Sequence, residues 1–331
     1  MAEKSTHSGE RIAKVIARAG LASRREAEAW IAAGRVSVNG KTIDSPALNV
    51  GARDRITVDG APLPRRARTR LFLYHKPRGL VTSHSDPEGR PTIFGALPKH
   101  LPRLISVGRL DMNTEGLLLL TNDGGLARVL ELPATAWLRS YRVRALGRVT
   151  QEALDPLRKG ITIDGIHYGA IEATLDREQG ANVWLTFAIR EGKNREVRRV
   201  LEHLGLKVNR LIRVSYGPFE LGKLDDGEVK EVVTEELREI LGPEIAEQAE
   251  ADFDGPLETE QPRSPLISAK AEIQKGQPTR HGRAGSPLSR GRTGPAAQST
   301  VERKDEKPRR LHKKRRPDRS GGPRPKYPRS K

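Results

Sequence analysis

The chain has 331 residues, no cysteine, and a net charge of +18 from 60 basic and 42 acidic residues. The lack of cysteine excludes a disulfide framework and thiolate chemistry, and no apolar run approaches the length of a membrane span. A chain of this length can fold as about two domains, and its positive charge indicates a polyanionic partner. We therefore expect a soluble, cytoplasmic protein that binds nucleic acid and not a membrane.

The first 64 residues follow a helix, helix, hairpin order. Apolar residues at helical spacing predict a helix over residues 11–20. Ser23 and Glu26 make the S-x-x-E pattern of a capping box, which opens a second helix. The strand that follows runs into Asn39-Gly40, a strong signal for a two-residue hairpin turn. These signals predict a small domain over residues 9–64.

The arginine-rich part of this domain resembles a known RNA-binding module. The run ASRREAEAWIAAGRVSVNGK, from Ala22 to Lys41, is similar to the S4 module. Several unrelated proteins that act on RNA carry this module, so the resemblance implies an RNA partner but no reaction. By the resemblance, the candidates for phosphate contacts are Arg24, Arg25, Arg35 and Lys41. For each of them a solvated helix face is the alternative interpretation.

After a Pro- and Arg-rich linker at residues 65–70, the pattern changes to strands that begin at Leu71. Two runs of strand character, 105–107 and 117–121, enclose a connection that contains Asp111. Loops between rigid elements are where reactive groups meet ligands. Taken alone, however, a loop aspartate more often does no more than cap a turn.

The surroundings of Asp111 favour the reactive interpretation. The run GRLDMNTEGLLLLTNDG, from Gly108 to Gly124, resembles the core motif of the RsuA/RluB group of RNA pseudouridine synthases. In that family the aspartate of the motif is catalytic. The pattern K-P-x-G-x-V-T-S, from Lys76 to Ser83, resembles the family's first motif. The resemblance implies that Lys76 packs beside the catalytic loop and does not react.

Two further motifs supply the other candidate site residues. In the predicted strand 137–146, Tyr141 matches the family's tyrosine that lies against the target base, as suits a uracil taken out of its stack. The run REGKNREVRRVLEHLGL, from Arg190 to Leu206, resembles the third motif, whose basic residue pairs with the aspartate. Arg198 is the aligned position, and its neighbour Arg195 stays open as the partner. Arg109 and Arg195 are also candidates for RNA binding.

The chemistry that the resemblance implies fits these residues. Conversion of uridine to pseudouridine breaks the N1–C1′ bond and joins C5 to C1′, which requires no redox change, and we expect neither a metal nor a cofactor. One ionised carboxylate is needed, either as a nucleophile on C1′ or as a base that removes a sugar proton. A neighbouring guanidinium favours the charged form of a buried carboxyl. A hydrolytic glycosidase would need two flanking carboxylates, for which Glu115 and Asp123 are the nearby candidates.

The acidic and basic residues after position 224 are segregated. Residues 225–260 contain 2 basic and 14 acidic residues, whereas residues 261–331 contain 21 basic and 5 acidic ones. Few of the residues in 243–331 are apolar, so we expect a disordered tail there, with an acidic spacer followed by a basic part. We predict that the basic part reinforces RNA binding. The tract from Pro308 to Pro317 also has the composition of a nuclear address.

Together these features predict an α+β protein. A small S4-like domain precedes a pseudouridine synthase domain over residues 71–242, which is built on a mixed, mostly antiparallel sheet. The resemblance implies a monomeric enzyme that modifies a uridine in ribosomal RNA. The sequence is most similar to family members that act on the 23S RNA of the large subunit or on its precursor. The alternative is a non-catalytic S4-type RNA-binding or ribosome-assembly factor, for which the basic charge would suffice.

Overall fold

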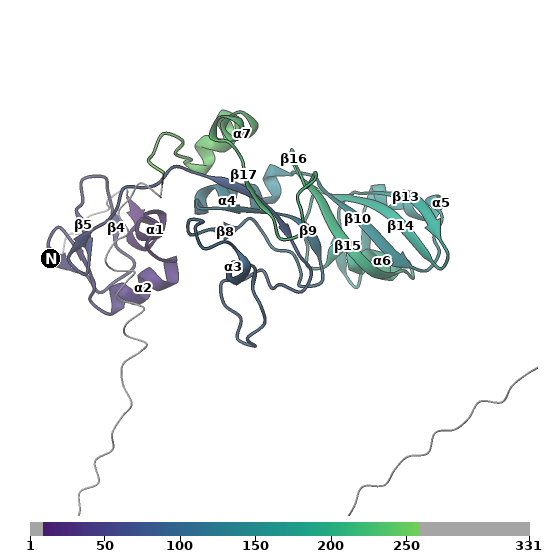
Figure 1. Cartoon of the computed structure of the whole chain (residues 1–331), viewed down its shortest axis with the longest axis horizontal. Coiled ribbons are helices and arrows are strands. Elements are labelled where there is room, and N and C mark those ends of the chain that lie inside the picture. The colour runs from purple at the N-terminus through teal and green to yellow at the C-terminus, as the bar shows by residue number, and fades with distance from the viewer. Residues whose placement is uncertain (1–8, 258–331) are drawn as a thin grey trace, which may run out of the picture. The chain divides into compact units, whose positions relative to one another are not determined.

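The computed structural model describes residues 9–257, so most of the predicted tail lies outside the described residues. The N-terminal region contains two helices and six short strands (Figure 1). They are β1 (Glu10–Arg11), α1 (Ile12–Arg18), α2 (Arg24–Ala32), β2 (Val36–Val38), β3 (Lys41–Thr42), β4 (Asn49–Val50), β5 (Ile56–Val58) and β6 (Ala61–Pro62). Strand β1 pairs with β4, and the other four form a sheet in the order β3-β2-β5-β6.

The predicted local signals explain this region. Ser23 accepts a hydrogen bond from the backbone N–H of Glu26, and the Glu26 carboxylate accepts one from the N–H of Ser23, so the capping box is confirmed. Asn39 and Gly40 both have positive φ, as the tight turn between β2 and β3 requires. Buried Ile12, Ile16, Ile31, Val36 and Val58 form the core beneath the helices.

The second region is organised around a nine-stranded sheet. Its main strands lie in the order β13-β14-β10-β15-β9-β7-β17, with β16 beside β15 and β8 beside β9. Every pair is antiparallel except β15 with β9, which confirms the predicted mixed sheet. The strands are β7 (Leu71–Lys76), β8 (Ile105–Ser106), β9 (Glu115–Thr121), β10 (Arg139–Leu146), β13 (Ile171–Gln179), β14 (Asn182–Ile189), β15 (Lys207–Tyr216), β16 (Phe219–Glu220) and β17 (Val229–Glu231).

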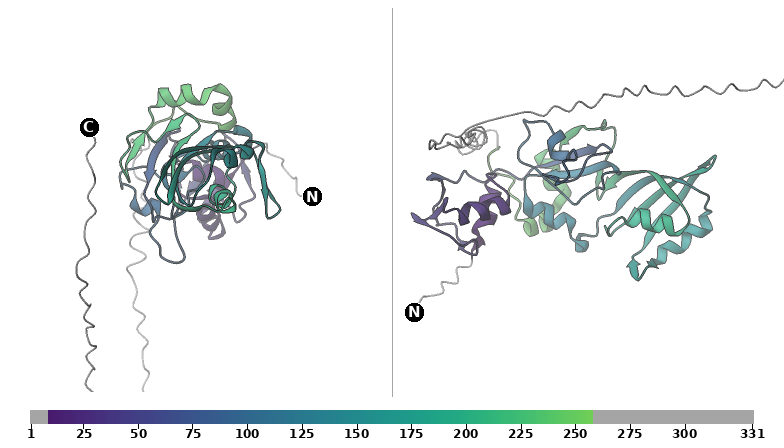
Figure 2. Two further views of the ribbon diagram at one scale, coloured as in Figure 1. Left: turned by 90° about the vertical axis from the view of Figure 1, so that its right-hand side faces the viewer. Right: turned by 90° about the horizontal axis from the view of Figure 1, so that it is seen from below.

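Helices cover this sheet and create two apolar clusters. The helices are α3 (Ile93–Ala96), α4 (Gly124–Glu131), α5 (Gln151–Leu154), α6 (Glu196–His203) and α7 (Thr234–Ala249), with a small hairpin of β11 (Ile161–Ile163) and β12 (Ile166–Tyr168). Apolar residues of α6 pack with the inner residues of β10, β13 and β14, which curl around this helix (Figure 2). Apolar residues of α4 and α7 pack with β9 in a second cluster.

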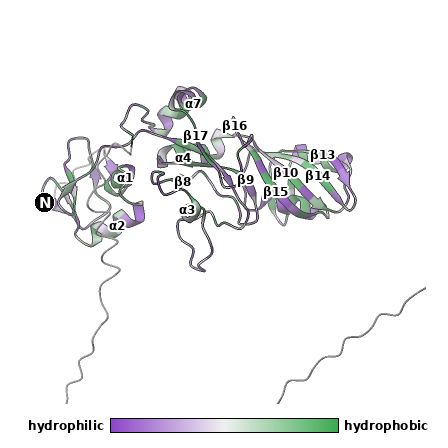
Figure 3. Ribbon diagram, viewed as in Figure 1, coloured by the Kyte–Doolittle hydropathy of each residue, from purple (hydrophilic) through white to green (hydrophobic). Residues whose placement is uncertain are grey.

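Residues alternate along the strands that carry the candidate site. In β10 the side chains of Arg139, Tyr141, Val143 and Ala145 are buried, while the residues between them are more exposed. Hydrophobic and hydrophilic residues therefore alternate along β10 and its neighbours (Figure 3). This period of two places Arg139 and Tyr141 on the face that α6 covers.

The C-terminal boundary of the second region differs from the prediction. We expected the folded part to end at residue 242, but helix α7 continues to Ala249, where it is buried against the second cluster. Gly242 leaves the helical conformation, with φ 64° and ψ 174°, and Pro243 begins a new helical turn after it. Gly242 therefore ends a first helical segment, and a second segment that starts at Pro243 continues the folded part to Ala249. Among residues 9–257, no helix has the length and apolar character needed to cross a membrane.

Candidate active site

A pocket of about 500 Å³ opens where three stretches of the second region meet. The loop from Gly108 to Thr114 forms one wall, and the segment from Ile189 to Arg198 forms another. The floor is the inner face of β10 and β15, with Tyr141, Leu211 and Arg213 among its side chains. The pocket therefore brings together Asp111, Tyr141, Arg195 and Arg198, which are far apart in the sequence.

The loop that carries Asp111 is fastened by the segment from Lys76 to Thr82. The Thr82 hydroxyl donates to the carbonyl oxygen of Leu110 at 2.7 Å and accepts from the N–H of the same residue at 3.3 Å. The N–H of Gly79 donates to the carbonyl oxygen of Met112 at 2.7 Å. These bonds hold the residues on both sides of Asp111. The first motif therefore supports the loop of the core motif.

Lys76 completes this support from inside the protein. Its side chain is fully buried, and Nζ donates to the carbonyl oxygens of Pro77 and Thr114 at 3.0 Å each and of Met112 at 3.5 Å. Burial lowers the pKa of Lys76 to about 8, although the nearby charge of Asp111 acts in the opposite direction. Lys76 therefore lies beside the candidate catalytic loop and holds its backbone.

The cation that pairs with Asp111 is Arg195. Its Nη1 donates to Oδ2 of Asp111 at 3.4 Å. Arg195 is the N-cap of α6 and has a left-handed backbone, with φ 52° and ψ 30°. Arg198, one turn into the helix, donates instead to the carbonyl oxygens of Asn113 at 3.0 Å and Val208 at 3.4 Å. Of the two arginines that the sequence left open, Arg195 thus makes the direct contact with the carboxylate, whereas Arg198 holds the backbone of the loop.

Electrostatic contacts still link Arg198 to the carboxylate. Burial and the neighbouring guanidinium of Arg195 lower the pKa of Arg198, while Asp111 raises it. Its Nε is buried and has no hydrogen-bond partner among the described residues. Two guanidinium groups therefore act on the Asp111 loop, one through the carboxylate and one mainly through the backbone.

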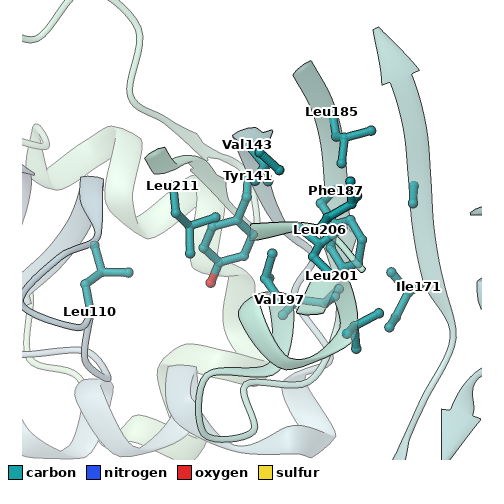
Figure 4. Packing of buried hydrophobic residues seen from close by; sticks show 14 of the residues in the cluster. Leu110, Tyr141, Val143, Ile171, Leu185, Phe187, Val197, Leu201, Leu206 and Leu211 are labelled. Carbon is teal, nitrogen blue, oxygen red and sulfur yellow. The ribbon is translucent and has the colours of Figure 1, made fainter. Parts of the chain in front are cut away.

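Tyr141 lies on the floor of the pocket with its ring packed. The side chain is 8% exposed, and its ring lies beside Leu211 and Val197 in the cluster under α6 (Figure 4). Its hydroxyl oxygen points away from Val143 (Figure 4). This packing fixes the orientation of the ring.

Glu196 has a structural role that its position in the sequence did not indicate. It is 3% exposed, and its Oε2 accepts a hydrogen bond from the N–H of Lys193 at 3.0 Å. Burial raises the pKa of its carboxyl, while the bond from Lys193 lowers it. The bond closes the tight turn before α6 that gives Arg195 its left-handed backbone. A capping-type pattern with an acid three residues after Lys193 is the only sequence signal for it.

The remaining predicted RNA-binding residues have different surroundings. Arg24, Arg25 and Lys41 are exposed in the N-terminal region, and exposed Arg109 lines the pocket. Arg35 differs from these, because its Nε donates to Asp59 at 2.9 Å and its guanidinium lies 4.9 Å from the centre of the Trp30 ring. The donors of Arg35 are thus partly used within the protein, which the sequence did not indicate.

The two carboxylates that a glycosidase would need are engaged elsewhere. Glu115 pairs with Arg210 at 2.8 Å. Asp123 is the N-cap of α4 and is buried, and it accepts hydrogen bonds from Thr69 at 2.7 Å and from Arg66 at 2.8 Å. Neither residue lines the pocket that contains Asp111. Glu115 and Asp123 are therefore not placed with Asp111 as a pair of carboxylates that flank one bond.

Comparisons with known proteins match both regions. The S4 domain model matches residues 10–56, and the RNA pseudouridylate synthase model matches residues 70–203. A Rickettsia felis protein named as an uncharacterized RNA pseudouridine synthase is 48% identical over 67% of this chain and 96% of its own length. The ribosomal large subunit pseudouridine synthase B of Haemophilus influenzae is 40% identical over 78% of this chain and 75% of its own length. A solved pseudouridylate synthase structure, 29% identical, aligns with 70% of this chain and 100% of its own, with a TM-score of 0.49.

Proposed function

Because the chain belongs to the RNA pseudouridine synthase family, we propose that it isomerises one uridine of 23S ribosomal RNA to pseudouridine, with Asp111 as the catalytic carboxylate. The observation that carries the proposal is the meeting of Asp111, Tyr141 and two arginines in one pocket. Residues 9–64 would bind the RNA, joined by the linker 65–70 to the catalytic region. We also propose that it acts in the cytoplasm.

Each side chain has a task that its position supports. The Asp111 carboxylate meets the sugar of the target uridine, as the nucleophile on C1′ or as the base that removes a sugar proton. Arg195 orients the carboxylate through their hydrogen bond. The Tyr141 ring offers a flat apolar surface to the displaced uracil, which is worth about 1–3 kcal/mol for a stacked base. Exposed Arg109 at the wall of the pocket is available for RNA phosphates.

A non-catalytic RNA binder is the competing function, and it predicts a different result. The isomerisation removes the hydrogen at C5 of the target uridine, so an enzyme releases tritium from ribosomal RNA labelled at that position. A binder releases none. We expect release in amounts that approach one tritium per RNA molecule. Absence of release from both naked 23S RNA and assembling large subunits would favour the binder.

The two arginines of the site should respond differently to conservative substitution. Arg195→Met should slow pseudouridine formation roughly tenfold, or about 1.4 kcal/mol, and Arg195→Lys should restore most of the rate because an ammonium can still pair with Asp111. Arg198→Lys should be slowed roughly 10²-fold, because one ammonium cannot replace a fork that donates to two carbonyl oxygens. Single-turnover rates measure both. The opposite pattern would assign the pairing with Asp111 to Arg198.

The basic tail should strengthen RNA binding in a salt-dependent way. Deletion of residues 261–331 removes 21 basic residues, so we expect weaker RNA binding at ~50 mM salt and a smaller dependence of affinity on salt concentration. Filter binding over a salt series measures this. A neutral Gly-Ser tail of the same length is the matched control, and it should behave like the deletion. Equal affinity of the full-length and truncated proteins at low salt would contradict the prediction.

A further inference from the structure

Arg213 is a buried arginine of the pocket to which the proposed function gives no role. It is 3% exposed and lines the same pocket as Asp111. Its Nε donates to the carbonyl oxygen of Leu117 at 2.7 Å, but its Nη2 is buried and has no hydrogen-bond partner among the described residues. Within residues 9–257, no carboxylate forms an ion pair or hydrogen bond with it. A buried guanidinium with no carboxylate partner and an unpaired Nη2 costs folding free energy, which indicates that Arg213 serves a ligand.

The position of Arg213 points to the base of the substrate. Arg213 and Tyr141 are paired residues on the neighbouring strands β15 and β10, and both side chains are buried on the same face of the sheet. Paired residues on one face have their Cβ atoms roughly 5 Å apart. A uracil that rests on Tyr141 would therefore lie beside the guanidinium of Arg213.

The other buried arginine of the pocket differs in this respect. Arg139 is 7% exposed, and its terminal nitrogens donate to the carbonyl oxygen of Arg190 at 2.5 Å and to the hydroxyl of Tyr216 at 2.8 Å. Both arginines contact the Tyr216 ring, with ring centre to guanidinium distances of 4.6 Å for Arg139 and 5.0 Å for Arg213. Both terminal nitrogens of Arg139 are thus held by the protein, whereas Nη2 of Arg213 has no partner among the described residues.

We propose that Arg213 is a catalytic residue that stabilises the uracil anion released during the isomerisation. The proposal rests on the function proposed above. When the N1–C1′ bond breaks, its electron pair leaves with the base, and the uracil carries a negative charge shared by N1, O2 and O4. C5 then attacks C1′, the proton of C5 is lost, and N1 finally holds a proton. The charge arises whether Asp111 adds to C1′ or removes a sugar proton. A preorganised donor at that charge lowers the barrier.

A phosphate is the less suitable ligand for this arginine. The phosphates of a displaced nucleotide stay with the RNA backbone outside the pocket, whereas the base reaches furthest into it. The exposed cations Arg109 and Arg195 line the same pocket and are accessible to phosphates outside it. Arg213 is enclosed on the floor, so the group that meets it is the base.

The test varies the leaving base and the arginine together. The target uridine in a short RNA is replaced by 5-fluorouridine, whose fluorine withdraws electrons and stabilises the uracil anion without help from the protein. The first-order loss of the target nucleoside is measured for both RNAs after nuclease digestion. Loss of the nucleoside is chosen because fluorine cannot leave as a proton in the last step.

We expect Arg213→Met to slow the loss of uridine ~10²-fold but the loss of 5-fluorouridine less than ~10-fold. Both rates come from one protein sample, so their ratio is independent of the folded fraction. Arg213→Lys keeps the charge, and its ratio should stay nearer the wild-type value; it also serves if the methionine variant does not fold. Arg210→Met is the matched control on the same strand, where Arg210 is exposed and pairs with Glu115, and both of its rates should be unchanged.

Three results would overturn the proposal. Equal slowing of both substrates would mean that Arg213 only ties β15 to β9 through Leu117. A loss of RNA affinity as large as the loss of rate would place Arg213 on a phosphate. Unchanged rates would show that it has no part in the reaction. If the wild-type protein converts no uridine at all, the proposed function fails instead, which separates the two failures.

Discussion

Replacement of Asp111 by asparagine is expected to reduce pseudouridine formation by ~10⁴-fold or more. The amide has nearly the same shape as the carboxylate, and its oxygen can still accept the hydrogen bond from Arg195. It cannot add to C1′, and it cannot remove a sugar proton. The loss therefore affects the chemical step and leaves the loop in place. Single-turnover conversion of ribosomal RNA measures the rate, and RNA affinity should remain within about twofold of wild type.

Glu115→Gln is the matched control for this variant. Glu115 lies four residues after Asp111, but its carboxylate pairs with the exposed Arg210 and does not line the pocket. Removal of this carboxylate should leave the single-turnover rate unchanged. A tenth or more of the wild-type rate in Asp111→Asn would show that another group is the catalytic carboxylate.

Lys76→Met should reduce both the stability of the protein and the rate of the reaction. The substitution removes the ammonium group that donates to the carbonyl oxygens of Pro77, Met112 and Thr114. We expect the free energy of unfolding to fall by about 1–3 kcal/mol and the rate to fall ~10²-fold, because the Asp111 loop is displaced. Thermal unfolding and single-turnover kinetics measure the two effects. A wild-type rate in a folded Lys76→Met protein would contradict the role of Lys76 as an anchor.

Because the pKa of Lys76 is lowered, its support of the Asp111 loop should depend on pH. Its value of about 8 in the folded protein lies below the ordinary 10.5. Between these two pH values the unfolded chain binds more protons than the folded chain, so this group makes the fold more stable as the pH rises. The neutral amine has one N–H fewer for its three carbonyl oxygens, so the loop should loosen over the same range. We expect activity to decline above about pH 8 without a loss of stability from this group.

Local signals in the sequence predicted much of the fold. The pair Ser23 and Glu26 marked the start of α2, and Asn39-Gly40 marked the hairpin, because both depend only on neighbouring residues. The mixed sheet followed from the family resemblance. The folded part was expected to end at residue 242, because few of the residues after it are apolar. A second helical segment nevertheless follows Gly242, and the burial of Ala249 against the second cluster holds it in place.

The sequence indicated which residues form the candidate site better than it indicated the contacts between them. Asp111 and Tyr141 stood in recognisable motifs, and the pocket contains both of them. The pairing of Asp111 with Arg195 depends on the left-handed backbone at the start of α6, which no spacing rule indicates. Arg213 could not be found from the sequence, because its importance arises from a missing partner. An arginine in a strand indicates nothing until its surroundings are known.

The most direct test of the account is a map of pseudouridines in 23S ribosomal RNA from cells with and without this protein. We predict that one site carries pseudouridine only when the protein is present. Expression of the wild-type chain should restore the modification, and the Asp111→Asn variant should not. Identical maps in the two strains, for the ribosomal RNA of both subunits, would contradict the claim that this chain isomerises a ribosomal uridine.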